Sequence, residues 1–227
     1  VGSITGTGTY NPISVSANGG NIDIPAGIST LGAISLDVWN GNIVTGDLSG
    51  PLLATSRYVS ASAHGNGSTT GNISVGAVTG TGYYAYESNL SADGSVTLAS
   101  FSDSYSSGGS GYSLVISSGN PFTDANVTNP ALGLRANNLS LAAYAPSGSD
   151  AIQLSTTPVM AQNVTLNGGN GKVSAALTGT TNLTIHSSDT SGTSPFNVST
   201  TSDLQSLTLE GDAAWIGGGS LLTSGGG

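Results

Sequence analysis

Cysteine is absent from this 227-residue chain, and positive charge is scarce. Without cysteine no disulfide can form, so a packed core has to hold the fold together. Lysine and arginine number only three, Arg57, Arg135 and Lys172, whereas twelve acidic residues bring the net charge to −9. Binding to nucleic acid or to an anionic membrane surface requires a cluster of cations. Three scattered cations exclude binding to nucleic acid and disfavour binding to an anionic membrane surface, and we expect no insertion into a membrane.

Long apolar runs and good helix formers are missing as well. No apolar run approaches the roughly 20 residues that a membrane-spanning helix needs. Glycine, serine and threonine number 35, 37 and 26, and together with asparagine they interrupt every window in which a helix could begin. The chain starts at Val1 and not at Met, and we expect it to lack a signal peptide and to be a processed chain or a fragment of a longer protein.

Short segments in which apolar and polar residues alternate are present throughout the chain. This period of two predicts β-strands, and many of the segments end at a turn-forming Gly, Asn or Asp. Examples are "NIDIPAG" (21–27), "AISLDVWNG" (33–41), "GSVTLAS" (94–100), "NLSLAAY" (138–144) and "SLTLEGD" (206–212). The alternation predicts an all-β fold.

The spacing of these segments indicates how the strands are arranged. The first apolar residues of four segments in the second half lie 25, 19 and 24 residues apart, and those of four segments in the first half lie 21, 30 and 23 apart. These residues are Leu139, Val164, Leu183 and Leu207, and Ile22, Ile43, Ile73 and Val96. Repeats of roughly 20–30 residues are typical of solenoids.

We therefore expect residues 1–227 to form a single β-solenoid of roughly ten rungs, about 50 Å long. The apolar residues of each segment would point inward. The asparagines that come directly before these apolar residues would stack in ladders, as in Asn163-Val164-Thr165-Leu166 and Asn182-Leu183-Thr184-Ile185. Two segments without clear alternation, 99–113 and 118–131, are expected to be loops. An antiparallel sandwich or barrel is the alternative, and it predicts neighbouring strands of opposite direction.

Several segments share one pattern, in which Asn or Gly comes before a strand of apolar, hydroxyl and apolar residues. They are "GNISVGAVTG", "ADGSVTLAS", "ANNLSLAAY", "AQNVTLNGGNGKVSAALTGTTNLTIHSS" and "LQSLTLEGDAA". In this style most of the chain resembles the stalks of bacterial exoproteins of the filamentous haemagglutinin type, which use two-partner secretion, and autotransporter passengers. The resemblance implies a right-handed parallel β-helix that is secreted or attached to the outer surface of a bacterium.

The resemblance also implies a role in cell adhesion, aggregation or binding of biofilm matrix, with a link to virulence. The expected partners are polysaccharide, a host or bacterial cell surface, or further copies of the chain. A self-assembling surface fibre is the main alternative, and a polysaccharide-degrading β-helix enzyme is a weaker one.

The residues themselves supply no catalytic or metal-binding constellation. The acids are strung out along the chain, and three cations are too few for a polysaccharide lyase site. His64 and His186 lack a second histidine or a cysteine at metal-ligand spacing, so both are expected to be outward surface residues. We expect no enzyme activity, no metal and no cofactor.

Aromatic residues give the one candidate ligand site. Exposed tyrosines can stack on sugar rings through an apolar face while the hydroxyl forms hydrogen bonds. The candidates cluster in "GYYAYES" and around a Ser/Gly-rich stretch: Tyr83, Tyr84, Tyr86, Tyr105 and Tyr112. Trp39 and Trp215 are expected to cover the core near a corner or an end of the rod.

Overall fold

The chain forms a rod of stacked β-coils in a computed structural model that describes residues 2–6, 12–30, 32–52, 59–68, 70–82, 87–103, 113–123, 127, 133–189, 196–211 and 220–223. Within these ranges all regular structure is β-strand, and every strand pair is parallel. This confirms the predicted parallel β-solenoid, and the parallel pairing excludes the antiparallel sandwich.

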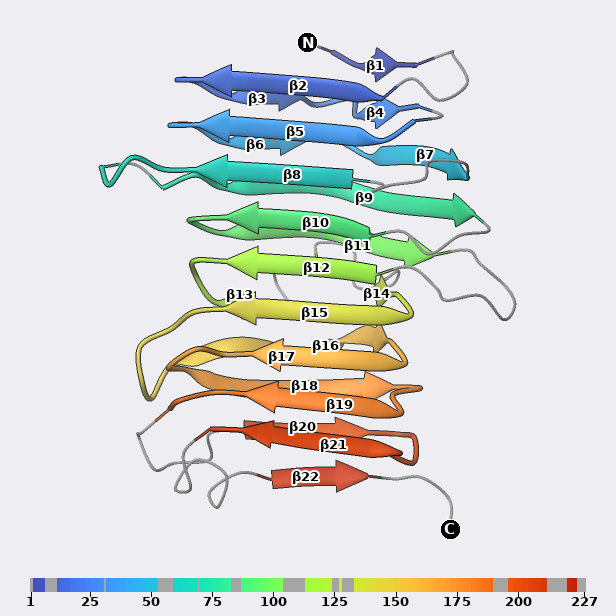
Figure 1. Ribbon diagram of the computed structural model, residues 1–227, viewed down its shortest axis with the longest axis vertical. Coiled ribbons are helices and arrows are strands. Elements are labelled where there is room, and N and C mark those ends of the chain that lie inside the picture. Colours follow the sequence, from blue (N-terminus) through green and yellow to red (C-terminus); the bar gives the residue numbers. More distant parts are fainter. Residues whose placement is uncertain are drawn as a thin grey trace.

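Two sheets run the length of the rod (Figure 1). The nine-stranded sheet contains β2 (Ile13–Asn18), β5 (Ile34–Trp39), β8 (Val59–His64), β10 (Glu87–Ala92), β12 (Ser113–Ser118), β15 (Asn138–Ala143), β17 (Asn163–Asn167), β19 (Asn182–His186) and β21 (Ser206–Glu210). The thirteen-stranded sheet follows β1 (Ile4–Thr5), β4 (Ile28–Ser29), β7 (Leu48–Leu52), β9 (Ile73–Gly82), β11 (Val96–Asp103), β14 (Leu134–Arg135), β16 (Asp150–Met160), β18 (Lys172–Thr178), β20 (Phe196–Thr200) and β22 (Ser220–Thr223), with β3 (Ile22–Ile24), β6 (Ile43–Thr45) and β13 (Phe122–Thr123) beside this path.

Each coil passes once through the nine-stranded sheet and returns through the other sheet in the opposite direction. Figure 1 shows the first set of strands in front, pointing one way, and the second set behind, pointing back, while the chain descends from its N-terminus. This sense of winding is right-handed, as is usual for crossovers between parallel strands. Nine strands in the front sheet give slightly fewer coils than the roughly ten rungs expected.

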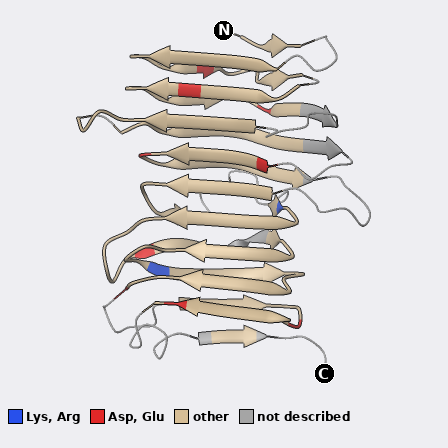
Figure 2. Ribbon diagram, viewed as in Figure 1, with Lys and Arg blue, Asp and Glu red and all other residues tan. Residues whose placement is uncertain are grey.

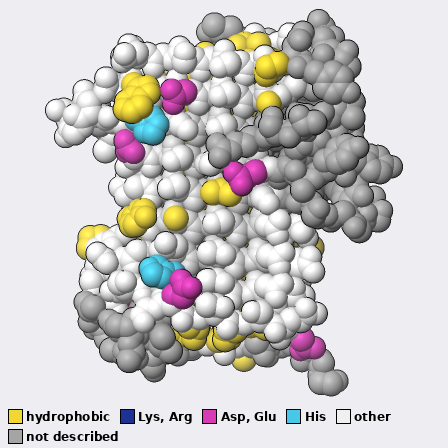
Figure 3. Space-filling view, in the orientation of Figure 1, with side chains coloured by type: hydrophobic (Ala, Val, Ile, Leu, Met, Phe, Trp, Pro, Cys, Tyr) yellow, Lys and Arg dark blue, Asp and Glu magenta, His cyan; other side chains and the backbone are white. Residues whose placement is uncertain are grey.

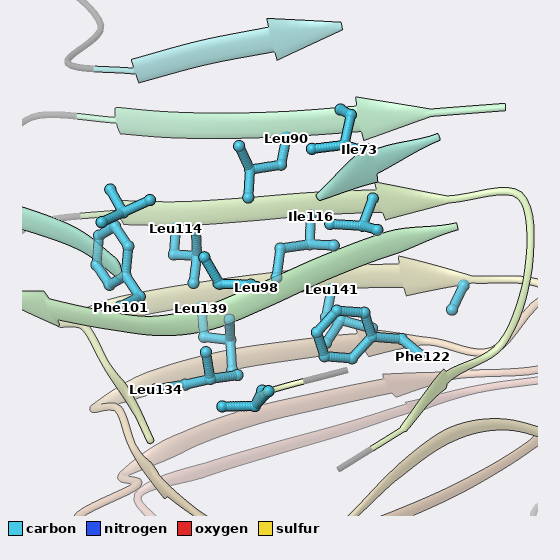
Figure 4. Packing of buried hydrophobic residues seen from close by; sticks show 14 of the residues in the cluster. Ile73, Leu90, Leu98, Phe101, Leu114, Ile116, Phe122, Leu134, Leu139 and Leu141 are labelled. Carbon is cyan, nitrogen blue, oxygen red and sulfur yellow. The ribbon is translucent and has the colours of Figure 1, made fainter. Parts of the chain in front are cut away.

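The core lies between the two sheets and consists of stacked apolar columns. Leu90, Ile116 and Leu141 are register partners on β10, β12 and β15, and all three are buried. Figure 4 shows Leu98 of the opposite sheet beside Ile116, and Phe122 beside Leu141. Alternation of inward and outward residues follows from the strand period of two. Each coil therefore contributes the same few inward positions to one continuous interior.

One segment that was expected to be a loop contributes to this core. Residues 118–131 contain β13, whose Phe122 is fully buried and pairs with Ile152. The prediction of a loop over this whole segment was wrong, because one large aromatic ring fills the inward position without an alternating pattern around it. In the other expected loop, 99–113, β11 extends to Asp103 and β12 begins at Ser113.

Asparagine ladders mark two different corners of the coil. At the corner that follows the nine-stranded sheet, Asn72 Nδ2 donates to Asn42 Oδ1 (2.9 Å), and Asn42 Nδ2 donates to Asn21 Oδ1 (3.2 Å). At the corner that precedes this sheet in the C-terminal half, Asn182 donates to Asn163 and Asn163 to Asn138, each at 2.6 Å.

Candidate functional site

The tyrosines expected to form a ligand site lie outside the described residues. This applies to all five positions, Tyr83, Tyr84, Tyr86, Tyr105 and Tyr112, and also to Trp215. Any candidate site in the described part of the chain therefore consists of other residues.

The richest surface is the edge at which the chain leaves the nine-stranded sheet. One outward position there repeats from coil to coil, and we call these residues the edge column. Their order follows from the register of successive strands and from the backbone hydrogen bonds that continue it. They are Asn18, Trp39, His64, Asp93, Gly119, Tyr144, Gly169 and Ser188.

The upper part of the edge column carries a stacked aromatic pair. Trp39 and His64 are register partners, with ring centroids 4.5 Å apart and an angle of 26° between the ring planes. Trp39 remains 52% exposed. The expectation that this tryptophan covers the core was wrong: it lies at a corner, but it points outward and covers an imidazole. His64, in contrast, is the outward residue that the sequence predicted.

Two carboxylates flank the imidazole of His64. Asp37 Oδ1 lies 3.9 Å from Nε2, and Asp93 Oδ1 lies 4.0 Å from Nδ1. The other oxygen of Asp93 accepts a hydrogen bond from the backbone N–H of Gly65 (2.8 Å), which fixes this carboxylate. Figure 3 shows a histidine between a hydrophobic group and acidic side chains near one edge of an otherwise largely polar face. All these groups are partly exposed, so they suit hydrogen bonding to a surface ligand.

Three coils further along, the edge column borders a hollow of about 340 Å³. Residues from three successive coils line it, and among the described residues none of them is charged: Gly119, Asn120, Pro121, Tyr144, Ala145, Pro146, Gly169 and Asn170. Tyr144 is half-exposed at this site. No sequence pattern indicated this site, because its parts are about 25 residues apart in the chain and meet only through the coil register.

A second imidazole–carboxylate contact lies in the neighbouring outward column. His186 Nδ1 is 3.4 Å from Glu210 Oε2, and the two residues are register partners on β19 and β21. As predicted, His186 faces outward. The pair is partly exposed, and contacts of this kind contribute little to stability.

Charged groups are sparse over the described surface (Figure 2). Among the residues that the structure describes, no group of three or more histidine, aspartate or glutamate side chains could hold a metal ion. In the same ranges no helix has the length and apolar character needed to cross a membrane. Among the described residues, two surface features combine an exposed aromatic ring with polar neighbours: the Trp39–His64 stack and the hollow beside Tyr144.

A scan against protein-family models, a search of curated proteins and a search of solved structures each found no match to this chain.

Proposed function

We propose that this chain is a stalk segment of a bacterial adhesin, secreted or displayed at the outer cell surface in the manner of filamentous haemagglutinin-type exoproteins and autotransporter passengers. In this role it is a stiff spacer whose sides attach to a partner, and it catalyses no reaction. The expected partners are polysaccharide of a biofilm matrix and the surface of a host or bacterial cell.

One observation carries the proposal, namely the unbroken parallel pairing through nine successive strands around a single apolar interior. Each coil is hydrogen-bonded to the coils above and below it, so bending the rod would break several backbone bonds at once. A structure of this kind holds its length under load, which is what a stalk between two surfaces requires.

The outward face of the nine-stranded sheet supports an attachment role. Its outward positions repeat small hydroxyl and amide side chains from coil to coil, and one column is interrupted only by Val115: Ser14, Ser35, Ser60, Asn89, Val115, Ser140, Thr165, Thr184 and Thr208. Such side chains offer both donors and acceptors, and they lack the cations that would attract nucleic acid. The face is suited to uncharged, hydroxyl-rich partners.

The test is attachment of beads that carry the purified chain to bacterial cells, cultured host cells and films of extracted biofilm polysaccharide. We expect retention under flow that exceeds that of beads coated with a non-adhesive protein of similar charge by about tenfold. Retention equal to the control on every surface would refute the adhesin proposal.

Two parallel measurements separate the alternatives. Concentration-dependent sedimentation and fibres in electron micrographs, without bead retention, would favour a self-assembling surface fibre. Release of reducing ends from the polysaccharide films would instead favour an enzyme.

A further inference from the structure

We propose that the hollow beside Tyr144 binds a pyranose ring of an uncharged polysaccharide. The inference deepens the proposed function, on which its biological role rests, by naming the chemistry of the partner at one site of the rod.

The hollow exists because glycine occupies the edge column on both sides of Tyr144. Gly119 precedes it and Gly169 follows it in the register of successive coils. A side chain at Gly119 would run into the carbonyl oxygen of Asp93. The edge column therefore has no side chain on either side of the tyrosine, and open space of about 340 Å³ remains beside the ring.

The tyrosine ring is held in place at this site. It lies over Gly169, where an added Cβ would be 2.6 Å from Cδ1 and 3.1 Å from Cε1 of Tyr144. Gly169 also adopts a positive φ of 56°, a conformation that favours glycine. A ring that rests on backbone and stays half-exposed presents a fixed apolar face to a ligand. Such a face suits the C–H groups of a sugar ring.

Two asparagine side chains supply hydrogen-bonding groups around the hollow. Asn120 Nδ2 donates to Ser95 Oγ (3.0 Å), which orients this amide, and its Oδ1 receives no hydrogen bond from the described residues. Asn170 is exposed at the rim, and its amide makes no hydrogen bond within the described part of the chain. Neutral amides donate to and accept from hydroxyl groups. Pro121 and Pro146 complete an apolar lining.

The charge around the site favours an uncharged sugar over an acidic one. No described residue that lines the hollow carries a charge, and the nearest charged member of the edge column is the carboxylate of Asp93. An anionic sugar would find no cation among the described lining residues and would meet a chain of net charge −9; Lys172, two residues beyond Asn170, has Asp150 as its register partner. A rigid aromatic platform, amides and little charge together match a neutral saccharide.

The experiment is an NMR titration of the purified full chain with uncharged tetrasaccharides built from glucose, mannose, galactose or N-acetylglucosamine, with tetragalacturonate as an anionic probe of the same size. We expect at least one neutral probe to shift the side-chain amide signals of Asn120 and Asn170, and tetragalacturonate to leave them unchanged. Tyr144→Ala should weaken binding of that probe by about tenfold, and Asn170→Ala by several-fold, whereas Tyr144→Phe should retain most of it. Trp39→Ala is the matched control, because it removes another half-exposed aromatic ring from the same column, and it should leave binding unchanged.

The proposal is overturned if no neutral probe binds the folded chain. It is also overturned if Tyr144→Ala binds as the parent does, if Trp39→Ala loses as much affinity as Tyr144→Ala, or if the anionic probe binds more tightly at these amides. The bead assay keeps the two proposals apart. Beads that still attach when Tyr144→Ala has no effect leave the adhesin role standing without this site. Sugar binding at Tyr144 without bead retention would leave the site standing without the role.

Discussion

Ser88 is the residue at which the core departs most clearly from its own pattern. It faces inward on β10 between Val59 and Leu114 of the adjacent strands, and its hydroxyl is buried without a hydrogen-bond partner among the described residues. A buried, unsatisfied hydroxyl costs about 1–3 kcal/mol. We expect Ser88→Ala to raise the free energy of unfolding by about 1 kcal/mol, measured as a higher midpoint in urea denaturation.

Ser91→Ala is the control for this substitution, since Ser91 lies on the same strand and points outward. It should leave the midpoint nearly unchanged. A Ser88→Ala protein that is less stable than the parent would show that the hydroxyl is satisfied in solution, for example by a trapped water molecule.

At the scale of single residues, the sequence predicted which side chains face outward, but it did not predict which side chains contact each other. Alternation alone placed His64 and His186 on the outside, because a strand turns each successive side chain to the opposite face. It could not indicate that Trp39 stacks on His64, since that contact depends on the coil length between residues 39 and 64. The same holds for the hollow at Tyr144, which depends on the absence of side chains on neighbouring coils.

The asparagine ladders act on the scale of strands, because they hold one coil in register with the next. Asn163 lies in the middle of the ladder of the C-terminal half, donating to Asn138 and accepting from Asn182. We expect Asn163→Ala to lower the free energy of unfolding by about 1–3 kcal/mol through loss of these two hydrogen bonds. Urea denaturation measures the loss.

Thr165→Ala provides the comparison, because Thr165 lies two residues further along the same strand and is exposed on the outer face. Its effect should stay within about 0.5 kcal/mol. Equal losses in the two variants would mean that the ladder adds nothing beyond strand propensity.

Asp189 ties together segments that are two coils apart. Its side chain is buried, and its Oδ1 accepts hydrogen bonds from Ser147 Oγ (2.7 Å) and from the backbone N–H of Gly148 (2.8 Å). We expect Asp189→Ala to destabilise the chain by about 2–4 kcal/mol, because the substitution removes both of these hydrogen bonds together with their buried acceptor. Asp189→Asn should lose less, since an amide oxygen can still accept.

Asp203→Ala makes the same change of charge at an exposed position and should have little effect on the denaturation midpoint. Because Pro146 adjoins the segment that Asp189 holds, Asp189→Ala should also weaken sugar binding at the hollow if that proposal is correct. An Asp189→Ala protein as stable as Asp203→Ala would rule out a structural role for the buried carboxylate.

On the scale of strands, the spacing of the apolar segments correctly predicted repeating coils. It did not show that the two series of segments belong to different sheets. The series Leu139, Val164, Leu183 and Leu207 stacks in the nine-stranded sheet, whereas Ile22, Ile43, Ile73 and Val96 stack in the other sheet. Both series were correct as columns, because an inward position recurs once in every coil. Strand β13 was not predicted, because a strand of only two residues, Phe122–Thr123, is too short to show an alternating pattern.

For the whole molecule, the sequence predicted the architecture because every coil repeats the same physical requirements: inward apolar residues, outward hydroxyls and corner residues. Function has no such repetition. A binding surface needs only one aromatic ring beside one gap, and a single such site leaves no periodic trace in the sequence. The fold was therefore predictable, whereas the hollow at Tyr144 emerged only from the three-dimensional register.

The coil repeat leads to a prediction about the length of the rod. Deleting residues 163–181 removes one full coil, and it joins Gln162 to Asn182 so that β19 takes the position of β17 and Asn182 pairs with Asn138. Because each coil contacts chiefly its neighbours, we expect a folded rod that is shorter by about 4.8 Å. Circular dichroism should retain its β-signal, and small-angle X-ray scattering should report the shortening. The bond from Asp189 to Ser147 spans the deleted coil, so some loss of stability is expected as well.

Deleting residues 163–171 is the matched control, because it removes β17 but leaves β18 and so stops halfway around the coil. The strands that follow would then reach the wrong sheet, with their apolar columns out of register with the core. We expect this shorter deletion to abolish cooperative unfolding even though it removes fewer residues. If it were the better tolerated of the two, the coils could not be the units that add up to this rod, and the stiffness on which the stalk role depends would need another origin.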